Sequence, residues 1–525
     1  MPESKVFAIL PYLTSCTMPT GVAWSRIRSN RPSSRQACTY YQDPIVPATL
    51  FPSSPPPYGD PIMATSSSPG SRELGLSILG VGSQYPPYAL KPDAVETLAK
   101  RFYPESPAMS KVLAINRYTG IDARSSIGDP EHPIVNDAVA PSISELHKVF
   151  MSDGVPLAVS AARKAFEDAG MTDPAAAAAS ITHVVSTTCT DSANPGYDHF
   201  VARELGLSDS VEKVLLHGVG CSGGLAALRT AANLALGHAM RGLPARILVM
   251  ALEVSTTFVR SELDSINAEQ NTRIGVCLFS DCASAVVLSN GIGHGLDAKE
   301  PAYELLGWQN MTIPDTELDL GFDVDPVGWK VVLTPRVPQL TTSALESSFT
   351  SLMASLPPLP PNYAKPSDFD WAMHPGGATI LTGAEKAMGI TPEHMRASYS
   401  TYMNHGNSSS ATIFSVLDCL RQKEMDALTP GGREPTDYVV GCAFGPGITV
   451  ETCMLRRRRK AVNAATGLQT PPETESEGSR SDDEDGAKDR SSSSREAAGN
   501  GPAGSAAATS GESFVNQAIS ELELD

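Results

Sequence analysis

Apolar stretches in the central part of the chain come in two lengths. Short continuous runs such as residues 181–186 and 245–252 are typical of strands buried on both faces of a parallel sheet. Longer segments at 155–169 and 225–239 have the apolar spacing and length of helices. Because the two kinds of segment alternate, residues 73–455 are predicted to form an α/β fold.

The second half of this region repeats the plan of the first. Strands are predicted at 76–81 and 276–288, and again at 369–373. Helices at 378–388 and 407–420 follow, and the region ends with a hairpin-like pair of strands at 438–443 and 448–455. The polar start and apolar body of the 407–420 helix mirror the helix at 225–239, which indicates an internal duplication.

Composition changes at both ends of this region. Residues 1–72 are rich in Pro and Ser, and before Asp43 they contain basic residues with Glu3 as the one acidic residue. That bias resembles a transit peptide, although a disordered extension explains it more simply. Residues 457–525 combine Ser and Gly with acidic clusters and are also predicted to be disordered. We therefore predict two halves, 73–290 and 291–456, between two disordered extensions.

Charge and cysteine usage exclude several classes of protein. A net charge of −18 argues against nucleic-acid binding, which needs a basic face. Nine cysteines without a C-x-x-C pair fit a reducing compartment, so we expect a cytoplasmic protein. The sequence has no apolar stretch long enough to span a bilayer. It also lacks H-E-x-x-H and clustered His/Cys spacing, so a zinc site is not expected.

The most informative residue is Cys221, in the glycine-rich turn His-Gly-Val-Gly-Cys-Ser-Gly-Gly (217–224) before the helix predicted at 225–239. Unpaired N–H groups and the helix dipole both favour an anion there, which predicts a lowered thiol pKa and a nucleophilic thiolate.

Two other motifs overlap this turn. A dinucleotide site is excluded because no acidic residue lies between Glu212 and Glu253. The residues also match G-x-S-x-G, which would make Ser222 the nucleophile of a hydrolase. Whether Ser222 has the acid and the histidine that such an enzyme needs must decide this alternative.

Two later residues could serve Cys221, and both are predicted at junctions where α/β folds place chemistry. His374 precedes Pro-Gly-Gly at the end of a strand and could act as base or ion-pair partner. Asn407 begins a helix and could donate to a developing oxyanion, although it could equally be an ordinary N-cap. His405 is a rival histidine in the loop before that helix. A hydrolase would need an acid and a late histidine after Ser222, and no acid stands at a matching junction.

Four motifs in order resemble the type III polyketide synthases of the chalcone synthase family, with the fungal branch closest. They are Gly-Val-Gly-Cys221-Ser-Gly-Gly, Trp-Ala-Met-His374-Pro-Gly-Gly-Ala, Gly-Asn407-Ser-Ser-Ser-Ala and Gly-Cys-Ala-Phe444-Gly-Pro-Gly-Ile-Thr. The resemblance covers roughly residues 75–455. It implies a thiolase-like αβαβα fold and a homodimer. It also implies that no metal or redox cofactor is needed, because decarboxylation supplies the driving force. The implied substrates are an acyl-CoA starter, of long-chain fatty type in the fungal branch, and malonyl-CoA, with alkylpyrones, alkylresorcinols or resorcylic acids as products.

The resemblance also implies roles for individual residues. Cys221 would carry the acyl group, while His374 would keep its thiolate ionised and, with Asn407, would stabilise the enolate left by decarboxylation of malonyl-CoA. Phe258 would be a gatekeeper between the CoA tunnel and the cavity, and Lys111 would contact a CoA phosphate. The remaining implied substrate-binding residues are Gly376, Thr188, Cys189, Thr190, Asn194, Phe444, Gly445, Pro446 and Gly447. A ketoacyl-ACP synthase III would share the three catalytic residue types, but it normally carries His-Gln-Ala-Asn in place of His374-Pro-Gly-Gly.

Overall fold

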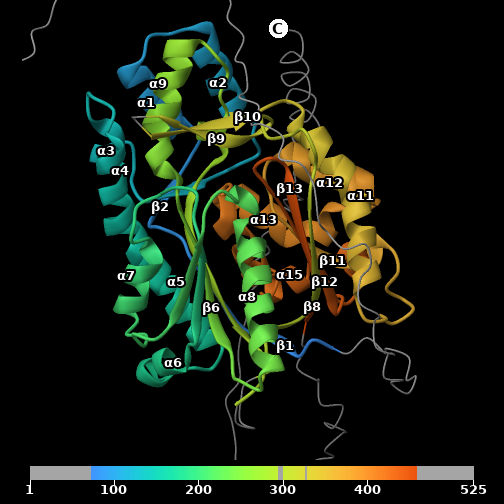
Figure 1. Cartoon of the computed structure of the whole chain (residues 1–525). Coiled ribbons are helices and arrows are strands. Elements are labelled where there is room, and N and C mark those ends of the chain that lie inside the picture. The colour runs from blue at the N-terminus through green and yellow to red at the C-terminus, as the bar shows by residue number, and fades with distance from the viewer. Residues whose placement is uncertain (1–72, 294–299, 326–327, 458–525) are drawn as a thin grey trace, which may run out of the picture. The chain divides into compact units, whose positions relative to one another are not determined.

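One mixed sheet organises the part of the chain that the computed structural model describes, residues 73–293, 300–325 and 328–457. Its nine strands lie in the order β11-β12-β13-β8-β1-β7-β6-β4-β5 (Figure 1). Strands of the first half are β1 (Leu76–Gln84), β4 (His183–Thr187), β5 (Glu212–Leu216), β6 (Arg246–Val254) and β7 (Asp281–Ser289). Those of the second half are β8 (Tyr303–Thr312), β11 (Asp370–Met373), β12 (Tyr438–Gly445) and β13 (Thr449–Arg457).

The two halves share one topology, which confirms the predicted duplication. In each half the first strand pairs antiparallel with the last, β1 with β7 and β8 with β13. Farther out the strands are parallel, β4 with both β5 and β6 in the first half and β11 with β12 in the second. The two first strands, β1 and β8, pair with each other where the halves meet, with Leu76 opposite Leu305.

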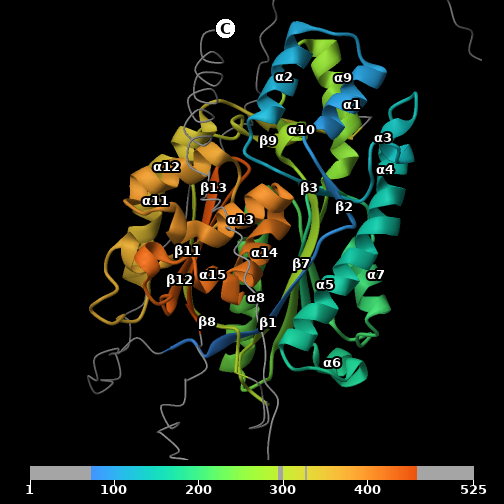
Figure 2. The same ribbon diagram turned by 180° about the vertical axis from the view of Figure 1, so that it is seen from behind.

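Helices form three layers around these strands (Figures 1 and 2). On the outer face of the first half lie α5 (Val155–Asp168), α6 (Pro174–Ser180) and α7 (Tyr197–Glu204). On the outer face of the second half lie α11 (Val337–Ser355) and α12 (Ala378–Met388). Between them, α8 (Gly223–Met240) and α14 (Thr412–Cys419) each contact strands of both halves. This arrangement confirms the αβαβα fold.

The middle layer explains why the α8 sequence is apolar on nearly every face. The helix α8 packs against β4 and β6 on one side and against β12 and β13 on the other. A helix that is buried on all sides has no solvent-facing surface for polar residues, so its sequence can be apolar all round. The first turn of α8 lies against the start of α14. A Cβ on Gly224 would lie 2.5 Å from Cγ2 of Ile413, so glycine permits this close approach of the two helix N-termini.

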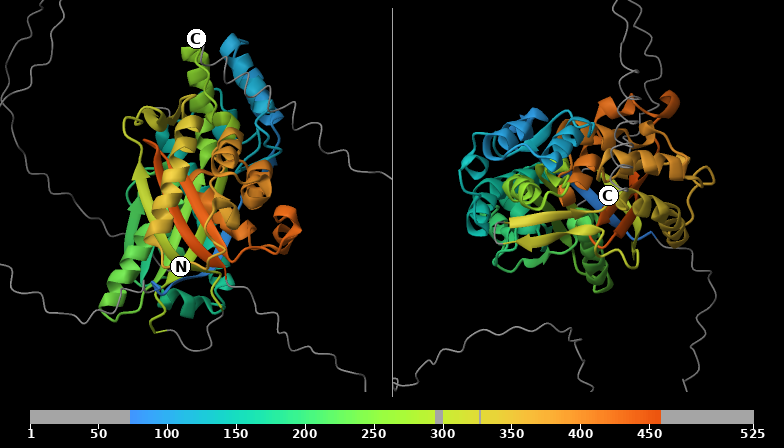
Figure 3. Two further views of the ribbon diagram at one scale, coloured as in Figure 1. Left: turned by 90° about the vertical axis from the view of Figure 1, so that its right-hand side faces the viewer. Right: turned by 90° about the horizontal axis from the view of Figure 1, so that it is seen from above.

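A further group of elements covers one end of the sheet (Figure 3, right). It comprises α1 (Asp93–Phe102), α2 (Pro107–Arg117), α9 (Val259–Glu269), α10 (Gly275–Leu278) and the hairpin of β9 (Leu320–Asp325) and β10 (Gly328–Leu333). The shorter remaining elements are β2 (Tyr88–Leu90), β3 (Arg124–Ser126), α3 (Pro133–Asn136), α4 (Ile143–Val149), α13 (Arg396–His405) and α15 (Lys423–Asp426). Among the described residues, none of the helices is both long and apolar enough to span a membrane.

Most predicted elements are confirmed, and two predictions were partly wrong. The strand expected over 276–288 begins only at Asp281, because residues 275–278 form the short helix α10 packed into the cluster of α1, α2 and α9. A short apolar run does not distinguish a buried helical turn from a strand. The helix expected from Asn407 begins after it, with a 3₁₀ turn at Ser409–Ala411 that leads into α14. The predicted extensions lie outside the described residues, apart from Arg457.

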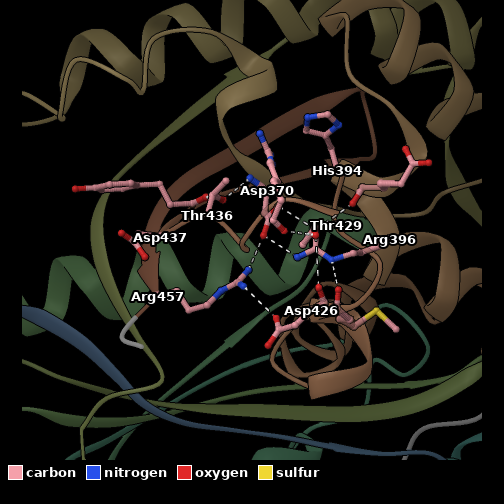
Figure 4. Close-up of polar contacts among 12 residues, drawn as sticks. Asp370, His394, Arg396, Asp426, Thr429, Thr436, Asp437 and Arg457 are labelled. Carbon is pink, nitrogen blue, oxygen red and sulfur yellow. Dashed lines mark hydrogen bonds and ion pairs between the residues drawn. The ribbon is translucent and has the colours of Figure 1, made fainter. Parts of the chain in front are cut away.

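A buried ion cluster fixes β11, the strand that leads to His374 (Figure 4). Asp370 is fully buried, and its carboxylate accepts two hydrogen bonds from Arg396, at 2.8 and 2.9 Å, and one from Arg457 at 2.9 Å. Burial acts to raise the pKa of Asp370, but the two guanidinium groups outweigh it and lower that pKa. The cluster therefore joins α13 and the end of β13 to the start of β11.

We predict that Asp370→Asn lowers the free energy of unfolding by about 3–5 kcal/mol, because two buried guanidinium groups lose their counter-charge. Since the folded-state pKa of Asp370 is lowered, its stabilising effect is present above the pKa of the unfolded chain. The effect is lost as the pH falls through the folded-state value. Urea unfolding of the wild type and the variant across a pH series measures the loss of unfolding free energy and its dependence on pH. Asp426→Asn is the control: its half-exposed carboxylate lies 3.9 Å from Arg457 and should contribute less than about 1 kcal/mol. Equal losses in both variants would contradict the prediction.

Candidate active site

Cys221 lies in a tight turn at the N-terminus of α8. The 3₁₀ turn Gly220–Ser222 follows β5, and the Cys221 side chain is only 9% exposed. Gly220 has a positive φ of 45°, and a Cβ there would lie 2.5 Å from Cδ of Pro446. The loop 444–447 is therefore packed directly on the cysteine turn. Glycine at 220 serves both the turn and this contact.

His374 follows the last residue of β11 and is 1% exposed. Its backbone N–H donates to the carbonyl of Cys442 at 2.8 Å, which extends the pairing with β12. Both ring nitrogens are buried and have no hydrogen-bond partner among the described residues. Burial lowers the pKa of His374 to about 3, so the ring alone is neutral. Unpaired buried nitrogens are costly, and they are common where a ligand supplies the missing partner.

Asn407 lies close to His374 although it comes from another element. It stands between α13 and the 3₁₀ turn Ser409–Ala411, so the predicted strand-to-helix junction is wrong here. Its backbone N–H donates to Leu278 at 3.0 Å, which pins the loop beside α10. The side-chain Nδ2 donates to the carbonyl of Gly376 at 3.3 Å. A Cβ on Gly376 would in turn lie 3.8 Å from Nε2 of His374, so Gly376 brings the two side chains together.

Ser409 connects this loop to the cysteine. Its N–H donates to Oδ1 of Asn407 at 2.8 Å, and its hydroxyl donates to Sγ of Cys221 at 3.3 Å. Its φ of 47° is rare for a residue with a side chain, and such strain persists where surrounding contacts impose it. The same hydroxyl lies 3.2 Å from Sγ of Cys189, and that thiol lies 3.4 Å from a carboxylate oxygen of Glu253.

Glu253 is a buried carboxyl at the centre of a polar network beside the two thiols. It accepts from the Thr188 hydroxyl at 3.3 Å, from the Cys189 N–H and from the Ser410 hydroxyl. Burial raises its pKa above the usual carboxyl range. Thr190 belongs to the same loop and accepts from the N–H of Val254 at 3.0 Å. Asn194, another residue for which the resemblance implies substrate binding, is exposed on the loop that leads to α7.

The resting state of Cys221 differs from the sequence-based prediction. Burial raises the pKa of its thiol to about 12, and the hydrogen bond from Ser409 offsets only part of that effect. Desolvation therefore outweighs the helix N-terminus, and the predicted lowering of the pKa is wrong for the isolated thiol. A thiolate at neutral pH needs a partner that accepts the proton and remains close as a cation. His374 is a candidate because its ring is neutral and its nitrogens are unpaired.

A cavity of about 390 Å³ lies beside the backbone groups that hold Asn407. Lys111 on α2 lines it together with Gly376 and Leu278, whose carbonyl oxygens accept the two Asn407 hydrogen bonds. Most of the lining is apolar, with Ala114, Ile115, Ile274, Leu333, Val337 and Ile380. The volume and the apolar walls with a few polar groups are typical of small-molecule sites. Two predicted substrate-binding residues, Lys111 and Gly376, thus share one cavity.

Phe258 lies at a second, smaller cavity of about 50 Å³. Its ring packs among Phe279, Phe322 and Trp329, with centroid separations of 5.1–6.3 Å. Neighbouring residues of the 276–279 segment line different cavities: Leu278 lines the larger, whereas Val276 and Phe279 line the smaller. Phe279 also forms a bridge with Asn407. Phe258 thus lines the smaller cavity, and its neighbour Phe279 connects it to the Asn407 loop.

Comparison with known proteins identifies this arrangement. Residues 111–292 match the N-terminal domain of chalcone and stilbene synthases, and residues 305–458 match the C-terminal domain. An acylalkylpyrone synthase of Aspergillus oryzae is 41% identical over 386 residues, covering 73% of this chain and 94% of the relative. The chain belongs to the chalcone and stilbene synthase family. It is a type III polyketide synthase, an acyltransferase that carries out decarboxylative condensation.

Solved structures extend the comparison to the fold of this synthase. A type III pentaketide synthase from Neurospora crassa is 70% identical in sequence, with a TM-score of 0.71. The match covers 73% of this chain and 100% of the Neurospora chain. The structure of CsyB complexed with CoA-SH is 40% identical, with a TM-score of 0.69 and the same coverage of both chains. The family assignment does not favour a ketoacyl-ACP synthase.

The rival nucleophile of this polyketide synthase, Ser222, is already engaged. Its hydroxyl donates to the carbonyl of Val219 at 2.8 Å. Gly445 covers it so closely that a Cβ there would lie 2.2 Å from Oγ of Ser222. A hydroxyl that is buried, hydrogen-bonded and covered by another segment is poorly placed to attack a substrate. The hydrolase reading is therefore not supported by the geometry.

Sequence reasoning missed Ser409 and Glu253 in this synthase. Ser409 lies two residues after Asn407, but nothing in the string of serines singles out the one that reaches Cys221. Glu253 is the penultimate residue of the apolar strand β6, and an acidic residue in so apolar a run was the one available signal. A buried carboxyl needs several donors, and here they come from segments far apart in the sequence.

We predict that Ser409→Ala slows alkylation of Cys221 about 10-fold to 100-fold at neutral pH. A hydrogen bond to a charged acceptor contributes about 1.5–3 kcal/mol, so its loss raises the thiol pKa and lowers the thiolate fraction. Reaction with iodoacetamide, followed by mass spectrometry of the Cys221 peptide, gives the rate against pH. Ser408→Ala is the control, since its hydroxyl lies 2.7 Å from Oγ of Ser280. A pH profile unchanged by Ser409→Ala would refute a role in tuning the thiol.

Proposed function

We propose that this type III polyketide synthase loads a long-chain fatty acyl-CoA onto Cys221 and extends it with several malonyl-CoA units. Its products would be alkylpyrones, alkylresorcinols or resorcylic acids, formed as triketides, tetraketides or pentaketides. The observation that carries the proposal is the buried imidazole of His374, whose ring nitrogens have no hydrogen-bond partner among the described residues. Close to it, Asn407 donates to the carbonyl of Gly376, which lines a cavity together with Lys111. Similarity to an acylalkylpyrone synthase supports the product class.

The first step is acylation. His374 accepts the Cys221 proton, and the thiolate attacks the carbonyl carbon of the starter thioester. The new C–S bond forms at Sγ as the bond to CoA breaks, and the CoA thiolate takes the proton back from the imidazolium. Because the acyl group moves from the thiol of CoA to the thiol of Cys221, a thioester is present both before and after the transfer. The ion pair formed with His374 offsets the burial that holds the thiol pKa near 12.

Extension uses the same two polar side chains on malonyl-CoA. The malonyl carboxylate leaves as CO₂, and its bonding electrons form an enolate whose oxygen accepts hydrogen bonds from His374 and Nδ2 of Asn407. The enolate carbon then attacks the acyl-Cys221 carbonyl, and Sγ leaves as thiolate. The chain is now two carbons longer and is carried on CoA. Return of that chain to Cys221 permits another round, and loss of CO₂ drives each condensation.

The cavities give a physical reading of the substrate-binding residues. We infer that Lys111 pairs with a CoA phosphate, because a cation on a largely apolar wall suits an anionic ligand. Phe258 would act as the gatekeeper between the CoA side and the growing chain. Thr188, Cys189 and Thr190 would border the acyl chain beside Glu253, and the loop 444–447 would hold the thioester against Cys221. The functional unit would be a homodimer with one site in each subunit.

The test is product analysis with the full chain. Malonyl-CoA is supplied with acyl-CoA starters from acetyl to stearoyl, singly and in equimolar competition, and products are identified by mass spectrometry. We expect pyrones or resorcinols, with long-chain starters preferred. A preference for short starters would overturn the proposed substrate. Release of free fatty acid without malonyl-CoA, unaffected by Cys221→Ala, would overturn the mechanism.

A further inference from the structure

Three side chains able to bind a metal ion meet at the end of α8 opposite to Cys221. They are His183, the first residue of β4, Glu212, the first residue of β5, and His238 in the last turn of α8. One ligand atom from each lies within 4.8 Å of the other two. Cys221 precedes α8, so the rise along the helix places this group ~25 Å from the catalytic turn.

The pairing of β4 with β5 brings the first two ligands together. The strands are parallel, and His183 stands opposite Glu212 in their register. Nε2 of His183 lies 3.7 Å from Oε2 of Glu212. The His238 ring meets the His183 ring edge to face, with centroids 4.6 Å apart. The proximity thus depends on the sheet register and on the length of α8.

Hydrogen bonds fix the tautomer of His183. The Thr182 hydroxyl has one proton, and it donates to the carbonyl of Arg246 at 3.0 Å. With that proton directed to Arg246, Thr182 Oγ1 is the acceptor for Nδ1 of His183, 2.7 Å away. The proton of the neutral ring is thus on Nδ1, and Nε2 presents a lone pair.

His238 is oriented in the same way. Its Nδ1 lies 3.3 Å from the carbonyl oxygen of Pro244, which can only accept, so Nδ1 carries the proton. Its Nε2 is then also a lone-pair donor. Histidines that bind metals commonly donate their other ring N–H to an oxygen of the protein, which fixes ring orientation. Thr182 and Pro244 supply such oxygens here.

Nε2 of His183 has no hydrogen-bond partner in the described part of the chain. The side chain is 2% exposed, so water does not readily satisfy this nitrogen. A bare lone pair facing a carboxylate 3.7 Å away is unfavourable unless a cation lies between them. Two imidazole nitrogens and one carboxylate oxygen are a donor set that suits Zn²⁺, with water as a fourth ligand.

We propose that His183, Glu212 and His238 form a binding site for a divalent cation of the zinc type. The ion joins the beginnings of β4 and β5 to the end of α8, and it stabilises the fold without taking part in condensation. The sequence analysis expected no metal because it looked for ligands at short spacing. These three residues are far apart in the chain and are united only by the sheet. The inference does not depend on the proposed substrate or product.

The test is calorimetric titration of the metal-stripped full chain with Zn²⁺. We expect one site in the wild type that is weakened at least 100-fold by His238→Ala and by Glu212→Gln. Both residues are at least partly exposed, so these variants are expected to fold, which circular dichroism checks. His199→Ala, at an exposed histidine on α7, is the matched control and should bind Zn²⁺ like the wild type. Thermal unfolding should shift upward with Zn²⁺ in the wild type and control alone.

A second variant tests the geometry apart from the ligands. Thr182→Val removes the acceptor that holds Nδ1 of His183 and should weaken Zn²⁺ binding about 10-fold to 100-fold. Co²⁺ as a spectroscopic probe distinguishes this site from the cysteines, because thiolate ligands add a charge-transfer band that nitrogen and oxygen ligands lack. Wild-type affinity in His238→Ala, a thiolate band, or failure of the wild type to bind Zn²⁺ would each overturn the proposal.

Discussion

Cys221→Ala is expected to abolish polyketide formation, with a loss on the order of 10⁴-fold or more. Without Sγ there is no atom to carry the starter, and the Ser222 hydroxyl cannot replace it because it is covered and donates to Val219. Decarboxylation of malonyl-CoA should survive, since His374 and Asn407 remain. Acetyl-CoA should therefore accumulate in the variant. Mass spectrometry of all CoA esters, with and without a starter, measures both activities in one experiment.

The separation of the two activities is the decisive part of this result. Cys419→Ala is the control, because Cys419 is a half-buried thiol at the end of α14. It should leave both activities intact. Continued product formation by Cys221→Ala would exclude Cys221 as the acyl carrier. Loss of decarboxylation together with condensation would mean that Cys221 also supports the position of His374, and the division of roles proposed here would fail.

Sequence pattern predicted the architecture well because each signal was local. The apolar run at 245–252 and the apolar helix at 225–239 owe their composition to burial on both sides, and both were confirmed as β6 and α8. A short apolar run does not predict a strand where its residues are buried by helices rather than within the sheet. The run at 276–288 starts with a helix because α10 packs under α2 and α9 rather than joining the sheet.

The site was less predictable, because its geometry depends on contacts between distant segments. Cys221 and His374 could be identified from their turns, and the structure places Cys221 just before α8 and His374 directly after β11. Ser409 could not, since its role follows from a strained φ and a bond to a residue far away in the sequence. The raised pKa of Cys221 was mispredicted for a related reason. A helix N-terminus is visible in a sequence, whereas desolvation by the opposite half of the molecule is not.

His374→Gln is expected to reduce condensation about 10³-fold, and to reduce malonyl-CoA decarboxylation as well. Glutamine can donate a hydrogen bond, but it cannot accept the thiol proton and hold it as a cation. Cys221 should then titrate as an isolated buried thiol with a pKa of about 12. Its alkylation at neutral pH should fall steeply and should recover only in strongly alkaline solution. The rate of iodoacetamide labelling against pH, measured beside product formation, follows both effects.

The matched control for this variant is His405→Gln. His405 also lies near the Asn407 loop, but its ring stacks on Tyr85 at 3.6 Å and its Nδ1 lies 3.0 Å from Oγ of Ser125. Burial lowers the pKa of His405 to about 4, so it resembles His374 in charge but has partners. Retention of both activities in His405→Gln and their loss in His374→Gln would assign proton transfer to the unpartnered ring. An alkylation profile unchanged in His374→Gln would show that the Cys221 thiolate forms without it, and the proposed ion pair would have to be abandoned.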